Sequence, residues 1–258
     1  MREAGHEVSI VDRMIHGGPP EDFAKKALSY DAVGFTTIAS SYYPDAKDVA
    51  SAIKRLDKDV ITFAGGHHAT FMYPLVLNDG FDYIVRGEGE VTSVDLMRAI
   101  SSGKPVSEVM GIAYKDGSSV KLTPPRPPLL NLDESPMPAW DLIKQDEYRA
   151  DVIEKGAKFA TIETARGCPY NCDFCSVTAM WGHSWRMKSE KRIMQEIDLL
   201  RDLGYKHMFF VDDDLVIPGS EEARKHLFVS LSQEAPEIRW FAQIRADLVV
   251  RRQDVMEA

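Results

Sequence analysis

The chain has 258 residues, of which 44% are apolar and 28% charged, the composition of an ordinary soluble globular protein. This length suggests two domains, and a formal net charge of -9 argues against a nucleic-acid-binding surface or an anionic membrane as partner. No apolar run is long enough to span a bilayer, and no signal-peptide core follows Met1.

The first hundred residues alternate short apolar segments with amphipathic ones. We expect strands at 6–12, 32–37, 60–64 and 83–85, and helices at 21–30, 44–56 and 90–100. This alternation indicates a flavodoxin-like (Rossmann-type) parallel sheet covered on both faces. The opening residues resemble the end of a helix that stops at Gly5. We therefore expect an N-terminally incomplete domain that lacks its first, internal strand.

A proline-rich stretch separates the two halves of the chain. A predicted hairpin over 109–122, turning at Asp116-Gly117, precedes six of the fourteen prolines, which fall between 124 and 138. That density resists regular structure and marks a semi-rigid linker. The predicted organisation is an α/β domain over 1–105, a hairpin and linker over 106–155, and a second α/β domain over 156–258.

The second half restarts the alternation. We expect strands at 159–164, 207–211 and 238–244, and helices at 189–203 and 221–233. Ser189 suits the N-cap of the first of these helices, and Gly204 suits its stop. Three strand–helix units suggest half of a (β/α) barrel, or a chain cut before its barrel is complete.

The only three cysteines of the chain, Cys168, Cys172 and Cys175, follow the strand at 159–164 directly. An odd number cannot form a disulfide framework, and reduced cysteines without a secretion signal indicate a cytoplasmic protein. Thiolates gathered on one short loop are ligands for a soft metal centre. Three protein ligands would also leave one position of a four-iron cluster open for chemistry.

Two simpler metal centres compete with that hypothesis. A structural zinc site would take His183 as its fourth ligand, but such sites usually combine paired cysteine knuckles from two segments. An electron-transfer ferredoxin centre would need a fourth cysteine, which the chain lacks.

The spacing Cys-x3-Cys-x2-Cys, with Phe174 before the last cysteine and Arg166-Gly167 before the first, resembles the signature of radical S-adenosylmethionine (SAM) enzymes. The resemblance implies that Cys168, Cys172 and Cys175 hold a [4Fe-4S] cluster and that SAM binds the fourth iron. It implies that the reduced cluster cleaves SAM to a 5′-deoxyadenosyl radical, with an electron donor such as a flavodoxin or ferredoxin. The loop backbone at Phe174 would then meet the adenine.

Two later segments are candidates for SAM contacts by the same resemblance. Asp213 is the preferred contact among the three aspartates that follow the strand at 207–211, and Arg245 ends the next strand, where it would pair with a carboxylate. The plainer alternatives are that the aspartates form a solvated turn or cap a helix, and that Arg245 is structural. Trp181 and Trp185 either cover the cluster or serve as packing.

The N-terminal half extends the resemblance to the cobalamin-binding subgroup of the superfamily. The segments that carry it are 31–35, 64–70 and 85–90. Glycines after strands let a backbone approach a ligand, and loops at strand carboxyl ends form the binding crevice of a parallel sheet. The resemblance implies that this edge faces the corrin and holds its nucleotide tail, through Thr37, Ser40, Ser41, Gly65, Gly66, His67 and Gly87.

One motif departs from the wider group of cobalamin proteins. Many of them bind cobalt through the histidine of Asp-x-His-x-x-Gly, whereas this chain places His16 four residues after Asp12 and on the wrong strand. We therefore expect no cobalt ligand from that motif. His67 and His68 are either replacements or loop histidines that hydrogen-bond locally. A domain that has kept its fold and lost the cofactor is the alternative to cobalamin binding.

These observations predict a cytoplasmic, cobalamin-dependent radical SAM enzyme that transfers a methyl group to an unactivated carbon of a small-molecule substrate. One alternative is radical cyclisation or rearrangement of the tetrapyrrole cyclase type. Another is a cofactor-binding fragment without turnover. No residue pattern in the chain names the substrate.

Overall fold

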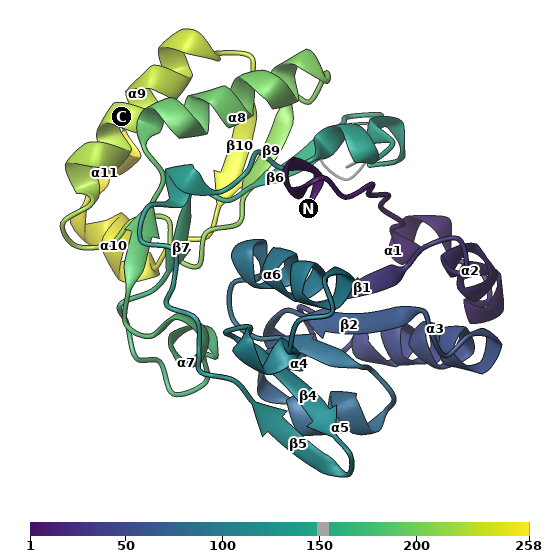
Figure 1. Cartoon of the computed structure of the whole chain (residues 1–258). Coiled ribbons are helices and arrows are strands. Elements are labelled where there is room, and N and C mark those ends of the chain that lie inside the picture. The colour runs from purple at the N-terminus through teal and green to yellow at the C-terminus, as the bar shows by residue number, and fades with distance from the viewer. Residues whose placement is uncertain (149–154, 258) are drawn as a thin grey trace. The chain divides into compact units, whose positions relative to one another are not determined.

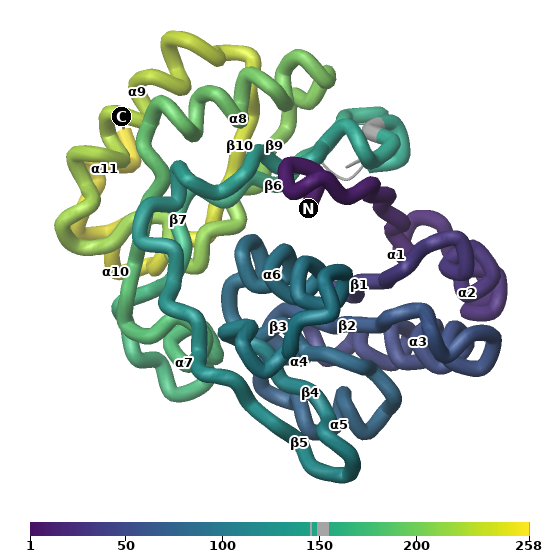
Figure 2. The backbone as a smooth tube through the Cα atoms, viewed as in Figure 1, coloured from purple at the N-terminus to yellow at the C-terminus, as the bar shows by residue number. Residues whose placement is uncertain are grey.

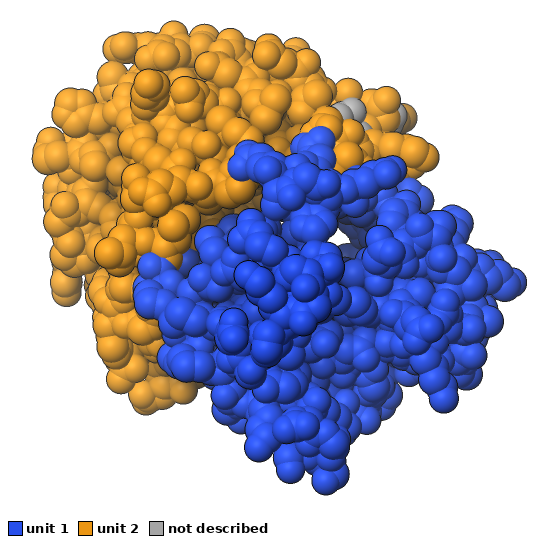
Figure 3. All heavy atoms as spheres, viewed as in Figure 1, with its two compact units in different colours: residues 1–128 blue, residues 129–258 orange. Residues whose placement is uncertain are grey.

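The computed structural model describes residues 1–148 and 155–257. The chain divides into two compact units, Met1–Pro128 and Leu129–Ala258 (Figure 3). Each unit contains its own parallel sheet, so the predicted α/β class is confirmed. The part of the predicted linker at 149–154 lies outside the described residues. Across the described part of the chain, no helix combines the length and apolarity needed to cross a membrane.

Unit 1 is a five-stranded sheet in the order β1-β2-β3-β4-β5 (Figure 1). Its parallel strands are β1 (Ala32–Thr36), β2 (Ile61–Gly65) and β3 (Tyr83–Val85). Its helices are η1 (Arg2–Ala4), α1 (Arg13–His16), α2 (Pro20–Ala27), α3 (Tyr43–Leu56), α4 (His67–Phe71), α5 (Tyr73–Asn78), α6 (Gly89–Ser101) and η2 (Val106–Glu108). The helix α3 buries Val49, Ala50 and Ile53, because residues three and four apart share one helix face.

The predicted hairpin belongs to this sheet rather than to the linker. The strands β4 (Ile112–Asp116) and β5 (Ser119–Leu122) pair with each other in antiparallel fashion, and β4 pairs with β3. Ile112 and Ala113 are fully buried. Their burial explains the assignment: apolar residues on the hairpin pack into the core of the sheet, which a free linker segment would not do.

The predicted strand at 6–12 is wrong. These residues follow η1 as an irregular segment that leads to α1, where the side chain of Asp12 caps the helix (Figure 2). Ile10 and Val11 are 46% and 51% exposed. Among the described strands, β1 pairs with β2 alone. An alternating apolar pattern becomes a strand only where a neighbouring strand accepts its backbone hydrogen bonds.

Unit 2 contains the predicted three strand–helix repeats. Its parallel strands lie in the order β10-β9-β6, with β6 (Phe159–Ile162), β9 (His207–Phe210) and β10 (Arg239–Ala242). A separate antiparallel pair joins β7 (Ala165–Gly167) to β8 (Trp185–Met187). The helices are η3 (Leu132–Glu134), η4 (Trp140–Leu142), η5 (Gln145–Glu147), α7 (Val177–Trp181), α8 (Glu190–Asp202), α9 (Glu221–Glu234), α10 (Ala246–Arg251) and α11 (Gln253–Met256).

Opposite faces of the three-stranded sheet have different partners. Alternate residues such as Ile162 and Phe210 enter the core formed with α8 and α9. On the other face Phe209 and Phe241 stack at 4.8 Å between ring centroids, and Phe159 stacks on Phe241 at 5.6 Å. This division follows from the period of two along a strand. The cysteine loop begins beyond the carboxyl end of β6, next to the carboxyl end of β9.

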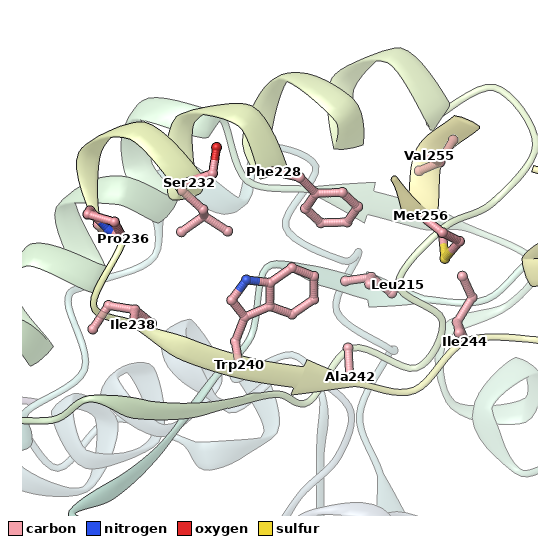
Figure 4. Close-up of a pocket in the computed structure, with 12 residues that line it drawn as sticks. Leu215, Phe228, Ser232, Pro236, Ile238, Trp240, Ala242, Ile244, Val255 and Met256 are labelled. Carbon is pink, nitrogen blue, oxygen red and sulfur yellow. The ribbon is translucent and has the colours of Figure 1, made fainter. Parts of the chain in front are cut away.

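An apolar cavity of about 450 Å³ lies beside α9, β10 and α11 (Figure 4). Trp240, Ile244 and Phe228 contribute to its wall. None of the residues predicted to form the functional site lines it.

Candidate functional site

The start of the cysteine loop is fixed by a carboxylate from the neighbouring strand. After β6, the backbone N–H groups of Thr164 and Ala165 both donate to Asp212, at 2.6 and 3.0 Å. The hydroxyl of Thr164 donates to the same carboxylate. Asp212 follows β9 and is only 2% exposed. The predicted solvated turn is therefore wrong for this residue, because its oxygens are used inside the unit.

A buried arginine neutralises this carboxylate. Arg224 on α9 is fully buried and donates to Asp212 at 2.8 Å and to the Thr164 hydroxyl at 2.7 Å. Its guanidinium also lies over the Trp185 ring, 5.4 Å from the centroid. Burial lowers the pKa of Arg224, and the charge of Asp212 opposes that shift. We call Thr164, Asp212 and Arg224 the buried clamp.

A second aspartate holds the loop three residues further along the chain. The N–H of Gly167 donates to Asp213 at 2.9 Å. Gly167 has φ +95°, and a Cβ there would lie 2.1 Å from the backbone oxygen of Ser184. Only glycine fits this combination of backbone angle and space. Asp213, predicted as a SAM contact, thus has a positioning role that does not depend on SAM.

The three cysteines are partly buried on the loop that follows. The N–H of Cys175 donates to the carbonyl of Cys172 at 3.0 Å, which turns the loop back on itself. The pKa of Cys168 is raised, first by burial and then, against a backbone hydrogen bond that lowers it, by the charges of Asp214 and Asp213. Phe174 is 93% exposed. The loop therefore presents an apolar ring and three sulfur donors on one short segment.

We tested whether these donors fit the implied cluster. Within residues 1–148 and 155–257, no three His, Cys, Asp or Glu side chains converge closely enough to hold a single ion. A four-iron cluster does not need such convergence, because each thiolate binds a different iron. Three thiolates and no fourth cysteine are a donor set that fits a [4Fe-4S] cluster with one open position. His183 is exposed, and its Nδ1 lies 3.3 Å from the carbonyl of Pro169.

Among the three aspartates the sequence favoured Asp213, whereas the structure distinguishes Asp214. It is 2% exposed, and neither carboxylate oxygen has a hydrogen-bond partner of normal geometry among the described residues. Burial raises its pKa to about 6, although Arg245 and the backbone N–H groups of Arg245 and Val216 oppose the shift. A buried carboxyl with a raised pKa and without a hydrogen bond of normal geometry is a recognised sign of a binding site. Nothing in the sequence distinguishes it from its two neighbours, since only burial does so.

Arg245 is brought to the cysteine loop, as the functional alternative requires. Its guanidinium carbon lies 3.9 Å from the Tyr170 ring centroid, and its Nη1 lies 3.9 Å from the sulfur of Cys172. Asp247 accepts a hydrogen bond from its Nε at 3.0 Å. The two tryptophans pack against arginines, since Trp181 lies under Arg166 and Trp185 under Arg224.

In unit 1, the predicted contacts gather at the carboxyl edge of β1, β2 and β3, and two of them hold this edge together. Thr37 is fully buried. Its hydroxyl donates to the carbonyl of Gly65 at 2.9 Å and accepts from the N–H of Ala69 at 3.2 Å. Gly66 has φ +97°, and a Cβ there would approach the Thr37 backbone to 3.0 Å. Both residues therefore connect β1 to the start of α4.

The remaining predicted contacts surround this junction. Ser40 bonds Nδ1 of His68 at 2.8 Å, and the Tyr43 ring lies 4.4 Å from the His68 ring. His68 fits the loop-histidine alternative, and burial lowers its pKa. Ser41 is exposed, and His67 begins α4. The N–H of Gly87 donates to the hydroxyl of Thr70 at 3.2 Å.

Comparisons with known proteins agree with both halves of this reading. A family model described as "B12 binding domain" matches residues 1–97. "Uncharacterized methyltransferase PH0819" of Pyrococcus horikoshii is 35% identical over 94% of this chain and 52% of its own length. The "Hopanoid C-3 methylase" of Methylococcus capsulatus is 28% identical over all of this chain and 48% of its length. The chain thus spans about half the length of these relatives.

A third relative has another activity in its name. The "Anaerobic magnesium-protoporphyrin IX monomethyl ester cyclase" of Rubrivivax gelatinosus is 35% identical over 77% of this chain and 37% of its length. Among solved structures, the radical SAM methyltransferase TsrM from Kitasatospora setae, with tryptophan and a SAM analogue bound, matches with TM-score 0.72 at 19% identity, over 93% of this chain and 49% of that one. The cobalamin-dependent SAM radical enzyme OxsB with aqua-cobalamin bound matches with TM-score 0.77 at 23% identity, over 94% and 34%.

The structural likenesses establish the fold, and the sequence matches add relatives named as methyltransferases, a methylase and a cyclase. A B12-binding match at the N-terminus, a cysteine loop after the first strand of unit 2, and curated relatives that cover nearly the whole chain all agree. Over nearly its whole length, the chain is therefore similar to cobalamin-binding radical SAM enzymes.

Proposed function

We propose that this chain is the cobalamin- and cluster-binding part of an enzyme that transfers a methyl group to an unactivated carbon of a small molecule. The observation that carries the proposal is the cysteine loop itself. Its three thiols follow a strand end that the buried clamp and Asp213 fix from the next strand. A metal centre with an open coordination position needs such a preformed and rigid support.

In this proposal each residue of unit 2 has a defined role. Cys168, Cys172 and Cys175 hold the [4Fe-4S] cluster. When bound, the cluster and SAM supply one-electron cleavage of a carbon–sulfur bond, and cobalamin supplies the methyl group. Asp214, whose buried carboxylate oxygens lack a hydrogen bond of normal geometry among the described residues, offers a carboxylate to a polar group of SAM. Phe174 offers an exposed apolar ring beside the last thiolate.

In unit 1 the carboxyl edge of the sheet is the proposed cobalamin site. Thr37 and Gly66 hold the edge, while Ser40, Ser41, Gly65, His67 and Gly87 offer backbone and polar groups around it. Two exposed apolar side chains, Ile38 at 64% and Tyr42 at 48%, lie on the segment after β1. Such a mixture of apolar surface and backbone donors suits a large, flat cofactor.

The position of His16 supports the expectation that the histidine of this motif does not bind cobalt. His16 ends the short helix α1, and its Nδ1 lies 2.7 Å from the carbonyl of Asp12. It therefore lies on a helix instead of a loop after a sheet strand. We propose that neither His16 nor His68 binds cobalt.

A second function is favoured by one finding. The magnesium-protoporphyrin cyclase of Rubrivivax gelatinosus is 35% identical over 77% of this chain, the same identity that the methyltransferase of Pyrococcus horikoshii has over 94% of it. Radical cyclisation of a tetrapyrrole-like substrate is therefore the alternative. In either case a cytoplasmic electron donor such as a flavodoxin or ferredoxin would reduce the cluster.

Anaerobic reconstitution tests the proposal. We expect a brown protein that cleaves SAM to 5′-deoxyadenosine when reduced, and loss of cleavage in each of Cys168→Ala, Cys172→Ala and Cys175→Ala. Cleavage by all three variants, or zinc in place of iron after oxygen-free purification, would contradict the cluster assignment. Retention of a corrin through gel filtration tests unit 1 separately.

A further inference from the structure

Arg245 makes three contacts that together point at the cluster ligands. Its guanidinium carbon lies over the Tyr170 ring, 3.9 Å from the centroid, and Tyr170 stands between Cys168 and Cys172 in the chain. Its Nη1 faces the sulfur of Cys172 at 3.9 Å. Its Nε donates to Asp247 at 3.0 Å. The guanidinium group thus contacts an aromatic ring, a cysteine sulfur and a carboxylate at the same time.

This arrangement is more specific than a surface ion pair. An exposed pair of Arg245 and Asp247 alone would leave both side chains many rotamers and contribute little. Here the ring fixes the plane of the guanidinium and Asp247 fixes its rotation about that plane, because arginine donors form a rigid fork. With the group held in this way, its Nη1 is directed toward the sulfur of Cys172.

The position of the sulfur decides what such a donor does. Hydrogen bonds and positive charge near cluster sulfurs are among the determinants of reduction potential. A [4Fe-4S] cluster with three thiolates carries a net charge of -1 when oxidised and -2 after it accepts one electron from a donor. A cation at Cys172 stabilises the second state more than the first. No other bond is made or broken in that step.

We propose that Arg245 is a positioning residue that donates a hydrogen bond to the Cys172 thiolate and raises the reduction potential of the cluster, held in place by Tyr170 and Asp247. This inference rests on the proposed [4Fe-4S] cluster and deepens it, since it assigns Arg245 to the cluster and not to the carboxylate of SAM. It concerns the protein before SAM binds.

The test is a redox titration of the reconstituted protein without SAM, followed by electron paramagnetic resonance of the reduced cluster. Arg245→Gln removes the charge, and we expect the ratio of reduced to oxidised cluster at a fixed potential to fall three- to tenfold, where tenfold corresponds to a 59 mV lower potential. Arg245→Lys keeps the charge without the fork and is expected to restore part of that loss. Tyr170→Leu keeps the arginine but removes the ring under it, so a smaller fall in the same direction is expected.

A matched arginine in the same unit controls for charge and folding. Arg201 on α8 donates to Glu237 and Asp198, and Arg201→Gln should leave the potential unchanged. An unchanged potential in Arg245→Gln, with iron content equal to that of the unsubstituted protein, overturns the inference while leaving the cluster in place. Failure of the unsubstituted protein to assemble a cluster overturns the proposed function instead. If Arg245→Gln loses iron, Tyr170→Leu decides instead, and an unchanged potential in that variant with normal iron content overturns the inference.

Discussion

The two candidate cofactor regions are held together by different kinds of interaction. In unit 2 a fully buried ion pair, Arg224 with Asp212, fixes the start of the cysteine loop. In unit 1 the corresponding junction at the sheet edge is held by neutral groups, the Thr37 hydroxyl and the Gly66 backbone. Both regions lie at the carboxyl ends of parallel strands.

The difference suits the ligands that we propose for each region. A charged cluster needs a loop whose sulfur atoms stay in place when an electron arrives, and buried charges with fixed partners resist such movement. A large, flat cofactor needs close approach of backbone, for which glycines and small hydroxyl side chains are suited. The comparison also predicts a difference in fragility, because a buried charge left without its partner costs far more than a lost neutral hydrogen bond.

The largest expected effect is on the buried clamp. Arg224→Met leaves the carboxylate of Asp212 buried without its cation, so we expect unit 2 to lose about 3–5 kcal/mol of unfolding free energy. Urea denaturation measures this change. The double variant Arg224→Met with Asp212→Asn should recover much of the loss, whereas equal losses in the single and double variants would show that charge is not what the clamp balances.

A second prediction compares two glycines with positive φ. Gly167→Ala places a Cβ 2.1 Å from the carbonyl oxygen of Ser184, while Gly182→Ala at φ +68° meets nothing within 4 Å. We expect a loss of about 3 kcal/mol for the former and about 1 kcal/mol for the latter, which has backbone strain alone. Iron bound per chain after reconstitution should fall only in Gly167→Ala. Equal iron content in both variants would argue against a preformed loop.

The third prediction uses the raised pKa of Asp214, which is about 6. Because the folded protein holds this proton more tightly than the unfolded chain, stability should fall as the pH rises from about 4 to 6. Asp214→Asn removes that penalty and should be more stable by about 2–3 kcal/mol at pH 7, with no gain below pH 4. Thermal unfolding at both pH values checks the sign. A variant less stable than the parent at pH 7 would mean that the ionised carboxylate has a partner.

The smallest effect is expected at the neutral junction of unit 1. Thr37→Val removes the buried hydroxyl and takes its acceptor from the N–H of Ala69, while the carbonyl of Gly65 still accepts from the backbone N–H of residue 37. This change should cost about 1–2 kcal/mol. Thr36→Val is the matched control, because Thr36 is the preceding residue in the chain and is exposed. Corrin retention through gel filtration should weaken in Thr37→Val alone. A cost as large as that at Arg224 would remove the contrast between the two regions.

Much of the fold followed from patterns along the chain. The helix α8 begins one residue after Ser189, whose side chain caps it, and ends before Gly204, because capping and backbone angle are local properties. The same holds for the hairpin turn at Gly117. The prediction of a strand at 6–12 was wrong because it used only the local apolar pattern, whereas a strand also requires a partner elsewhere in the chain.

The cysteine spacing by itself determined the metal-binding hypothesis and the family resemblance, since ligand type and spacing are properties of sequence. Which of three consecutive aspartates holds a strand end, holds a glycine or stays unpartnered was decided only by the tertiary structure. Asp212, Asp213 and Asp214 have the same chemistry, but strand pairing and the position of α9 give them different neighbours. Burial and partners are relations between distant segments, and a single segment of sequence does not contain them.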